Sequence, residues 1–395
     1  MKIAIVGSGI SGNSLAYILS KNHNITLFEK NNRLGGHSHT HEIRINNKKF
    51  NVDTGFIVFN KKTYPLFTNL LDELNVKYEN SNMSFSVFSK KNNFEYNGTS
   101  VNTLFSQRKN IFNFRFLKMI YEIIRFNKLS VNFLSTKKEI SLGEFLNKNQ
   151  FSEYFCKNYI LPMGSAIWSA NLNKMLEFPA IFFINFFNNH GMLNINDRPQ
   201  WLTISGGSKE YVKKLTSSFN KSIRLNCEIQ SVERDSNCIT VKHKNGNEKF
   251  DFVILACHSN DALNLIKSPT ADEQKILSAI SYSKNTITLH TDGKIMPNKK
   301  LSWAAWNYNI DNNENKPIAL TYNMNILQNL NSSVPILVTL NDDGKINPKK
   351  IIKTINYSHP LFTFRSIEAQ KKCNIISGKN RTAFAGAYWG NGFHE

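Results

Sequence analysis

Residues 2–12 read KIAIVGSGISG, and this stretch decides the fold of the N-terminal part of the chain. The run from Lys2 to Val6 is rich in Ile, Ala and Val and is long enough for a buried parallel strand. Glycines at positions 7, 9 and 12 follow with the spacing GxGxxG, and the apolar positions within residues 10–20 predict a helix. A second strand is expected at residues 25–28. This order of elements predicts a βαβ unit of the Rossmann type that binds a dinucleotide.

The turn residues have separate roles in such a site. Gly7 permits the tight turn, Gly9 lets the backbone approach a pyrophosphate, and Gly12 lets the helix pack closely on the strand. Ser8 and Ser11 lie in the same turn, where the free N–H groups of the helix N-terminus face phosphates. We therefore predict that all five residues bind the cofactor.

Glu29 directly follows the second expected strand. A carboxylate at this place accepts hydrogen bonds from ribose hydroxyls and disfavours a 2′-phosphate, which makes NADP an improbable ligand. A glycine-rich turn without a nucleotide is the structural alternative. The complete set of elements within 29 residues favours the nucleotide site over that alternative.

The next residues, 29–37, read EKNNRLGGH and contain a second glycine pair. This segment resembles the flavin amine oxidase superfamily, which includes phytoene desaturases and protoporphyrinogen oxidase. The resemblance implies FAD as the cofactor, with the segment wrapped around the pyrophosphate and the flavin edge. The residues implied are Arg33, Leu34, Gly35, Gly36 and His37. His37 stands where the family carries Arg, and a histidine can be neutral at pH 7.

Further matches narrow the resemblance to a bacterial group of predicted NAD/FAD-binding, amine-oxidase-like proteins. They lie at residues 52–60, 161–163, 166–169, 197–201, 206–208, 302–308 and 386–395. The resemblance implies that Gly55 and Phe56 pass the flavin and that the backbone of Ile229 contacts adenine. It also implies that Gly386, Trp389 and Gly390 close the flavin site. Cys373 lies 13 residues before Gly386, so no thioether link is expected and the FAD is predicted to be noncovalent.

The fold class implied is α/β: a Rossmann-like FAD-binding domain with a discontinuous α+β substrate domain, of the amine oxidase and phytoene desaturase type. We expect residues 1–84, 201–270 and 351–395 in the FAD-binding domain. Residues 85–200, expected to be helical and aromatic, and 271–350 form the substrate domain. Family members continue past the position of Glu395 into a helix, so we expect weaker flavin binding or a longer natural chain.

Composition limits the remaining classes. Hydrophobic residues make up 41% and charged residues 20%, as in a soluble globular protein. Five scattered cysteines without a CxxC pair argue against a disulfide framework or zinc site. The histidines at 37, 39 and 41 alternate and would share one face of a strand, but no Cys or carboxylate at ligand spacing supports a metal site. We therefore expect a flavin-flanking turn there and no metal. Because no signal peptide precedes residue 2, we expect a cytoplasmic protein.

A basic segment suggests contact with a membrane. Over residues 108–128, aromatic and aliphatic residues are interspersed with cations. The cations are Arg108, Arg115, Lys118, Arg125 and Lys128. Such a helix is either interfacial or a domain helix with a solvated basic face. The net charge of +20 reflects either codon drift or an anionic partner such as the inner membrane. No recognition motif accompanies the charge, so nucleic acid is not expected. The oligomeric state is not indicated.

The substrate is the least determined feature. Flavin oxidation requires orientation more than acid–base groups, so no catalytic residue is identified. We predict that Trp168, Trp306, Tyr388 and Trp389 line the substrate pocket, with ordinary core packing as the alternative. The resemblance extends to regions joined to cyclopropane fatty acid synthases in plants.

These observations lead to one main functional prediction. We expect an FAD-dependent oxidoreductase that moves a hydride from a hydrophobic substrate, such as a lipid acyl chain, to flavin N5. The alternatives are a flavin oxidase of a small amine and a non-catalytic FAD-binding partner of a lipid-modifying methyltransferase.

Overall fold

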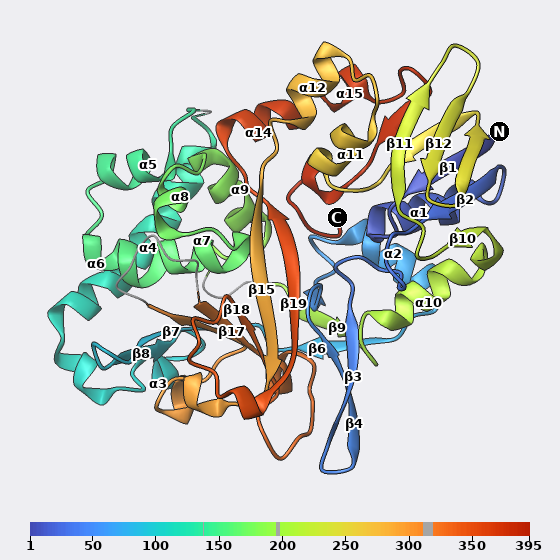
Figure 1. Cartoon of the computed structure of the whole chain (residues 1–395). Helices are drawn as coiled ribbons and strands as arrows, with labels where there is room; N and C mark the ends of the chain where they lie inside the picture. Colours follow the sequence, from blue (N-terminus) through green and yellow to red (C-terminus); the bar gives the residue numbers. More distant parts are fainter. Residues whose placement is uncertain (137, 195–197, 311–318) are drawn as a thin grey trace.

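The computed structural model describes residues 1–136, 138–194, 198–310 and 319–395. Asp197, which begins one of the family-like segments, lies outside the described residues. The chain forms two parts, one around a parallel sheet and one around a larger mixed sheet with a helical layer (Figure 1). Each part is assembled from segments far apart in the sequence, as the predicted discontinuous domains require.

The first part contains a five-stranded parallel sheet of order β10-β2-β1-β14-β20. Its strands are β1 (Lys2–Val6), β2 (Asn24–Phe28), β10 (Ile223–Arg224), β14 (Phe252–Leu255) and β20 (Thr382–Phe384). Helix α1 (Ile10–Leu19) joins β1 to β2. The predicted βαβ unit and the α/β fold class are confirmed, because β1 lies centrally with Ile5 paired to Leu27 on one side and Ile254 on the other.

Both faces of this sheet are covered. Ile3, Ile5 and Ala16 pack on the side of α1, whereas Ala4 and Val6 pack with Val232, Val241 and Phe250 on the other. The covering elements are β11 (Ile229–Arg234), β12 (Ile239–His243), β13 (Gly246–Phe250), α10 (Lys209–Ser217), α11 (Ser259–Leu265), α12 (Ala271–Leu277), α14 (Phe364–Gln370) and α15 (Cys373–Ile376). Burial on both faces explains the nearly continuous apolar character of β1.

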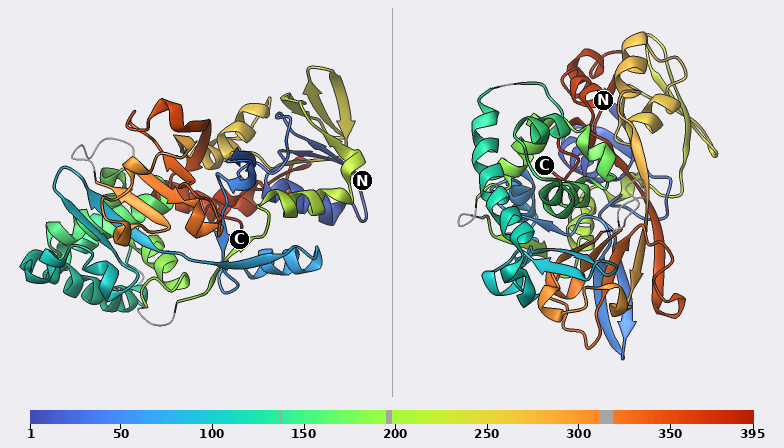
Figure 2. Two further views of the ribbon diagram at one scale, coloured as in Figure 1. Left: turned by 90° about the horizontal axis from the view of Figure 1, so that it is seen from below. Right: turned by 90° about the vertical axis from the view of Figure 1, so that its left-hand side faces the viewer.

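Three smaller elements extend the first part towards the second. They are the hairpin β3 (Thr40–Ile45) and β4 (Lys48–Asp53), the sheet β5 (Val58–Phe59), β9 (Trp201–Ile204) and β6 (Tyr78–Ser81), and helix α2 (Pro65–Glu73). Phe59, Phe67 and Leu71 bury the inner faces of this layer. The C-terminal segment packs here, between the two parts (Figures 1 and 2).

The second part contains a seven-stranded sheet of order β19-β15-β18-β17-β16-β7-β8. Its strands are β7 (Phe85–Ser89), β8 (Phe94–Asn97), β15 (Tyr282–His290), β16 (Trp306–Asn309), β17 (Ala319–Asn323), β18 (Leu337–Leu340) and β19 (Ile351–Pro360). The helices are α3 (Val101–Leu104), α4 (Phe114–Leu134), α5 (Leu142–Lys148), α6 (Glu153–Phe155), α7 (Leu161–Trp168), α8 (Leu172–Leu176), α9 (Ala180–Asn189) and α13 (Met324–Leu327). One aromatic core joins sheet and helices.

The expected basic helix exists as α4, but the segment 85–200 is not helical throughout. It begins with β7 and β8, because Val87 and Phe88 are buried and β7 pairs with β16 more than 200 residues away. The aromatic and β-branched residues of 85–97 suit strands, and both faces of β7 are covered. The prediction of a helical segment was wrong for residues 85–97, because it did not take the pairing of β7 with the distant β16 into account.

Two of the expected domain limits also shift. β19 pairs with β15 along its length, so residues 351–360 belong to the seven-stranded sheet. Ile276 and Leu277 of α12 are buried with Val253 of the parallel sheet, so residues 271–277 belong to the first part. Both domain boundaries are set by core contacts between residues that are distant in sequence, which the composition of each segment does not reveal. Within the described residues, no helix is long and apolar enough to cross a membrane.

Candidate active site

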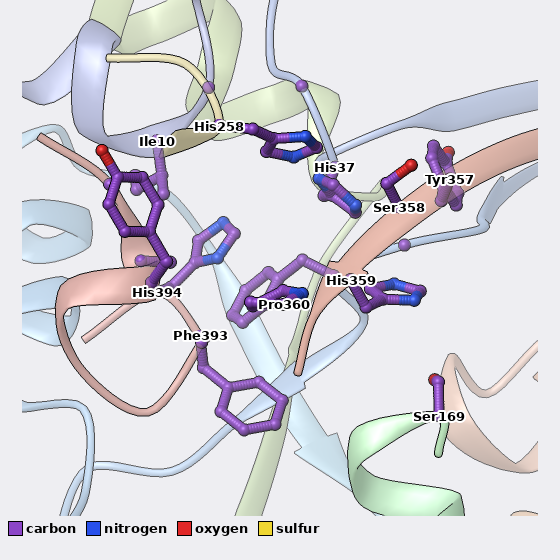
Figure 3. Close-up of a pocket in the computed structure, with 18 of the residues that line it drawn as sticks. Ile10, His37, Ser169, His258, Tyr357, Ser358, His359, Pro360, Phe393 and His394 are labelled. Carbon is purple, nitrogen blue, oxygen red and sulfur yellow. The ribbon is translucent and has the colours of Figure 1, made fainter. Parts of the chain in front are cut away.

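A cavity of about 1690 Å³ runs from the glycine turn after β1 into the second part of the molecule. A pocket for one drug-sized ligand has a volume of roughly 300–1,000 Å³, so this larger space suits an extended cofactor together with a second molecule. Figure 3 shows its central region, where side chains from the N-terminal segments, β19, the C-terminal segment and Ser169 after α7 surround one hollow.

The glycine turn forms the first end of the cavity. A Cβ on Gly7 would lie 2.5 Å from Ala256 O, and one on Gly12 would lie 1.9 Å from Gly7 O. These two glycines therefore allow strand and helix to touch. A Cβ on Gly9 meets nothing within 4 Å, because this residue faces the open cavity at the N-terminus of α1. This is the geometry that a pyrophosphate requires.

Glu29 is held rigidly beside this turn. Its Oε2 accepts hydrogen bonds from Ser8 N at 3.0 Å and Ser8 Oγ at 2.6 Å, and its Oε1 accepts one from Asn31 N at 2.9 Å. The carboxylate is nearly buried yet lines the cavity. A fixed acceptor at the end of β2 can receive the hydroxyls of a ribose.

The second glycine pair is tied to the first turn. Gly35 N donates to Ser8 O at 2.9 Å, and Arg33 Nη2 donates to Gly36 O at 2.8 Å. Arg33 lines the cavity and supplies a cation in this segment. His37, at the position where the family has Arg, supplies none at pH 7, because burial and the neighbouring His359 and His258 lower its pKa to about 3.

An imidazole cluster occupies the middle of the cavity (Figure 3). The His37 ring centroid lies 4.9 Å from Tyr357, 5.4 Å from His359 and 6.1 Å from His258. Nε2 of His37 is buried and lacks a hydrogen-bond partner among the described residues. A polar group of a bound cofactor would satisfy that atom. The described residues contain no group of three or more His, Cys, Asp or Glu able to hold a metal ion.

The C-terminal residues complete the middle of the cavity. The His394 ring stacks on Phe56 at 3.6 Å with an interplanar angle of 10°, and its Nε2 lies 2.9 Å from the hydroxyl of Tyr211. Glu395 accepts hydrogen bonds from the backbone N–H groups of Leu66 and Phe67 at the start of α2. Burial lowers the pKa of His394 to about 3. Sequence reasoning placed His394 in a family-like segment but did not assign it to the site.

Most of the predicted cofactor residues line the cavity. They are Gly7, Ser8, Gly9, Ser11, Glu29, Arg33, Gly35, Gly36, His37, Gly55, Phe56, Ile229 and Gly386. Gly12 and Leu34 lie behind this surface, where Gly12 allows the close contact of α1 with the turn.

Trp389 and Gly390 do not line the cavity. The Trp389 ring packs on Tyr388 at 5.0 Å, against the core of the first part, and Gly390 O accepts a hydrogen bond from Gln370. The chain turns at Gly392, with φ of 88°, and directs Phe393 and His394 inward instead. Phe393 and His394 therefore line the cavity, whereas Trp389 and Gly390 do not.

The far end of the cavity is an aromatic chamber in the second part. Its lining includes Met83, Phe85, Tyr96, Tyr159, Met163, Ile167, Trp168, Phe186, Met192, Trp201, Trp306 and Tyr322. Trp306 contacts Tyr322 edge-to-face at 5.1 Å. Trp168 is only 4% exposed and also packs on Phe178, so it serves the core as well as the chamber. Tyr388 lines the cavity near Cys257 and Tyr282, on the cofactor side.

Asp53 is a functional-site neighbour that sequence reasoning quoted but did not assign. Its buried carboxylate accepts hydrogen bonds from Ser208 N at 2.9 Å and from Gln328 Nε2 at 2.9 Å. Burial raises its pKa to about 6, against the hydrogen bonds that lower it. Asp53 thus joins β4 to α10 and to the second part, two residues before Gly55. The only signal that the sequence offered is its place in the family-like segment 52–60.

The fold and the cavity together define an FAD-dependent oxidoreductase, with a dinucleotide site at one end of the cavity and an aromatic chamber at the other. The family model of the flavin containing amine oxidoreductases matches residues 10–345, and the chain belongs to this family. Its cofactor is FAD. The open Gly9, the fixed Glu29 and the unpaired Nε2 of His37 fit that group. A comparison with curated protein sequences gave no match.

Solved structures show the same fold. Cyclohexylamine oxidase from Brevibacterium oxydans IH-35A is similar with a TM-score of 0.70 at 10% identity, over 100% of this chain and 94% of that one. A fatty acid isomerase from P. acnes that produces CLA has a TM-score of 0.67 at 15% identity, over 97% and 93%. A putative protoporphyrinogen oxidase from Exiguobacterium sp. 255-15 has a TM-score of 0.68 at 15% identity, over 100% and 96%.

Proposed function

We propose that this flavoenzyme oxidises a long hydrophobic chain, such as the acyl chain of a lipid, in the aromatic chamber. The observation that carries the proposal is the distribution of charge along the cavity. The acidic residues among its described lining are Glu29, Glu228 and Asp261. All three lie at the nucleotide end. Glu228 is close to Glu29, because the preceding residue, Cys227, donates its N–H to Glu29 O. Asp261 lies in α11, the helix that follows β14 of the parallel sheet.

The chamber itself offers aromatic and thioether surface and, within the described lining, no carboxylate; the charged side chain next to its Tyr159 is a cation, Arg198. A protonated amine that enters such a space loses hydration without a counter-charge, which is costly. A neutral hydrocarbon chain loses nothing comparable and gains from burial. Three methionines, Met83, Met163 and Met192, provide flexible walls that adapt to a chain.

FAD supplies the redox chemistry by accepting a hydride. The protein supplies orientation and a dry space. The neutral imidazoles of His37, His359 and His394 remain uncharged at pH 7, since their pKa values lie at about 3, 4 and 3. These imidazoles lie at the border of the chamber and are polar without carrying a net charge. The similar P. acnes protein is a fatty acid isomerase, which agrees with a chain-like substrate.

The test compares substrates that differ only in the head group. Holoprotein is mixed without oxygen with a monounsaturated phospholipid, the matching saturated phospholipid, the free fatty acid, and the alkylamine of equal chain length. We expect an acyl compound to bleach the flavin absorbance and the alkylamine to leave it unchanged. Bleaching by the amine alone would overturn the proposal and make the protein an amine oxidase.

A second candidate is a non-catalytic FAD-binding partner of a lipid-modifying methyltransferase. It predicts that no compound in the panel bleaches the flavin although dithionite does. It also predicts co-purification with the methyltransferase from cell extract, which the enzyme proposal does not require.

A further inference from the structure

The outer side of α4 carries a row of exposed apolar side chains. Phe114, Leu117, Tyr121, Ile124 and Val131 recur at intervals of three and four residues, with Lys128 at the remaining position. This spacing places them on one helical face. The opposite face, with Phe116, Met119, Phe126 and Phe133, is buried in the core. A helix that already buries one apolar face does not need a second one for folding.

The row continues into the segment before α4. Phe112 and Phe114 are 84% and 85% exposed, and Ile111 is exposed beside them in sequence. We call this set of residues the α4 ridge: Ile111, Phe112, Phe114, Leu117, Tyr121, Ile124 and Val131. Helix α4 lies on the outside of the helical layer (Figure 2, right, teal). An exposed apolar patch of this kind marks an interaction site.

The exposed charges between residues 96 and 138 all have one sign, and on the neighbouring helix α6 the exposed Glu153 forms an ion pair with Lys157. Arg108, Lys109, Arg115, Lys118 and Lys128 are exposed. Between residues 96 and 138 the only acidic residue in the sequence is Glu122, which is buried and accepts a hydrogen bond from Ser152 N at 2.8 Å. A second copy of this chain would bring the same cations against this surface, so self-association is opposed by repulsion.

We propose that the α4 ridge is a docking surface for an anionic lipid bilayer. The apolar side chains enter the interface between headgroups and acyl chains, and the cations contact anionic headgroups. The inner face of α4 stays packed on the core, so the protein docks as a rigid body without a spanning segment. Binding needs both elements, because single apolar or single electrostatic attachments to membranes are weak.

The position of the ridge has a consequence for the enzyme. Gly98 and Thr99 are exposed and line the cavity, and the ridge begins at Ile111, twelve residues after Thr99. The rim of the cavity and the ridge therefore lie on one continuous stretch of the chain. An acyl chain that leaves the bilayer beside this stretch enters the chamber without crossing bulk water. This consequence rests on the proposed function, whereas the docking surface itself does not.

The experiment measures flotation of holoprotein with vesicles of phosphatidylcholine alone or with phosphatidylglycerol, and needs no turnover. We expect binding to the anionic vesicles that weakens as salt rises. The double variant Phe112→Gln/Phe114→Gln should lower partitioning by about tenfold or more. Its matched control, Ile18→Gln/Leu66→Gln, removes exposed apolar residues of the first part and should bind as the unmodified protein does.

A second pair of variants separates local from overall charge. The variant Lys109→Glu/Lys118→Glu should lose vesicle binding. The control variant Lys213→Glu/Lys221→Glu has the same net charge but alters exposed lysines of the first part, and it should retain most of the binding. Three results would overturn the proposal: a ridge variant that binds vesicles as well as its matched control, equal binding of the unmodified protein to neutral and anionic vesicles, or no binding of the unmodified protein to either. A stable dimer that the Phe112→Gln/Phe114→Gln variant dissociates, without vesicle binding, would assign the ridge to self-association. Failure of the substrate test leaves these results unaffected.

Discussion

The two ends of the cavity are built in different ways. The nucleotide end is assembled mainly from residues 7–56, with polar groups fixed by short-range hydrogen bonds such as those of Ser8 to Glu29. The chamber end is assembled from residues between 83 and 322, held by aromatic packing. One end is a local structure that fixes a cofactor, and the other is a long-range structure that can change with the substrate. Substitutions should therefore separate the two ends cleanly.

The largest effect is expected at the nucleotide end from Gly12→Ala. The added Cβ would lie 1.9 Å from Gly7 O, which is backbone and cannot move aside. We expect loss of bound flavin and a free energy of unfolding lower by roughly 3 kcal/mol or more. Flavin absorbance of the purified protein and urea unfolding measure both quantities. Gly98→Ala is the control, since its Cβ would lie 3.9 Å from the nearest atom.

The region between the two ends should make the protein sensitive to acid. His37 and His394 have pKa values of about 3, below the value of about 6.5 in an unfolded chain. The unfolded chain thus binds protons that the folded chain excludes, and stability falls as the pH drops below 6.5. The loss is about 2 kcal/mol per histidine at pH 5.

Asp53 acts in the opposite direction, because its pKa of about 6 lies above the unfolded value. It offsets roughly 1 kcal/mol of the loss at pH 5. Urea unfolding at pH 7, 6 and 5 should show a steeper loss for Asp53→Asn and a shallower one for His394→Gln. A flat profile for the unmodified protein would mean that the imidazoles accept protons in the folded state.

A smaller effect is expected for Arg33→Gln, which removes the cation that lines the cavity beside the second glycine pair. Because His37 is neutral at pH 7, no imidazolium there replaces the lost charge. FAD affinity should fall by about 10- to 100-fold, as expected for a charged hydrogen bond, with little change in apoprotein stability. Titration of apoprotein with FAD measures it. The control Arg44→Gln removes an exposed cation of β3 that does not line the cavity.

The same contrast explains what the sequence could predict. The βαβ unit was predictable because its strand, turn, helix and acid lie within 29 residues, and their roles follow from local geometry. Strand β7 was not predictable, because its partner β16 lies more than 200 residues away. The C-terminal motif was located correctly, but the direction of each side chain depends on the turn at Gly392. Phe393 and His394 therefore reach the cavity in place of Trp389.

The smallest effect, and the sharpest test of separation, is expected from Trp306→Phe at the chamber end. Trp306 packs edge-to-face on Tyr322, and its ring Nε1 is buried without a hydrogen-bond partner among the described residues. The substitution reduces contact with a substrate but leaves every residue of the nucleotide end in place. We expect kcat/KM to change by on the order of tenfold while flavin content stays constant. Trp303→Phe is the matched control, because Trp303 does not line the cavity and donates to Pro297 O at 2.9 Å. If Trp306→Phe released flavin, the chamber and the cofactor site would be one mechanical unit, and the division between the two ends would not hold.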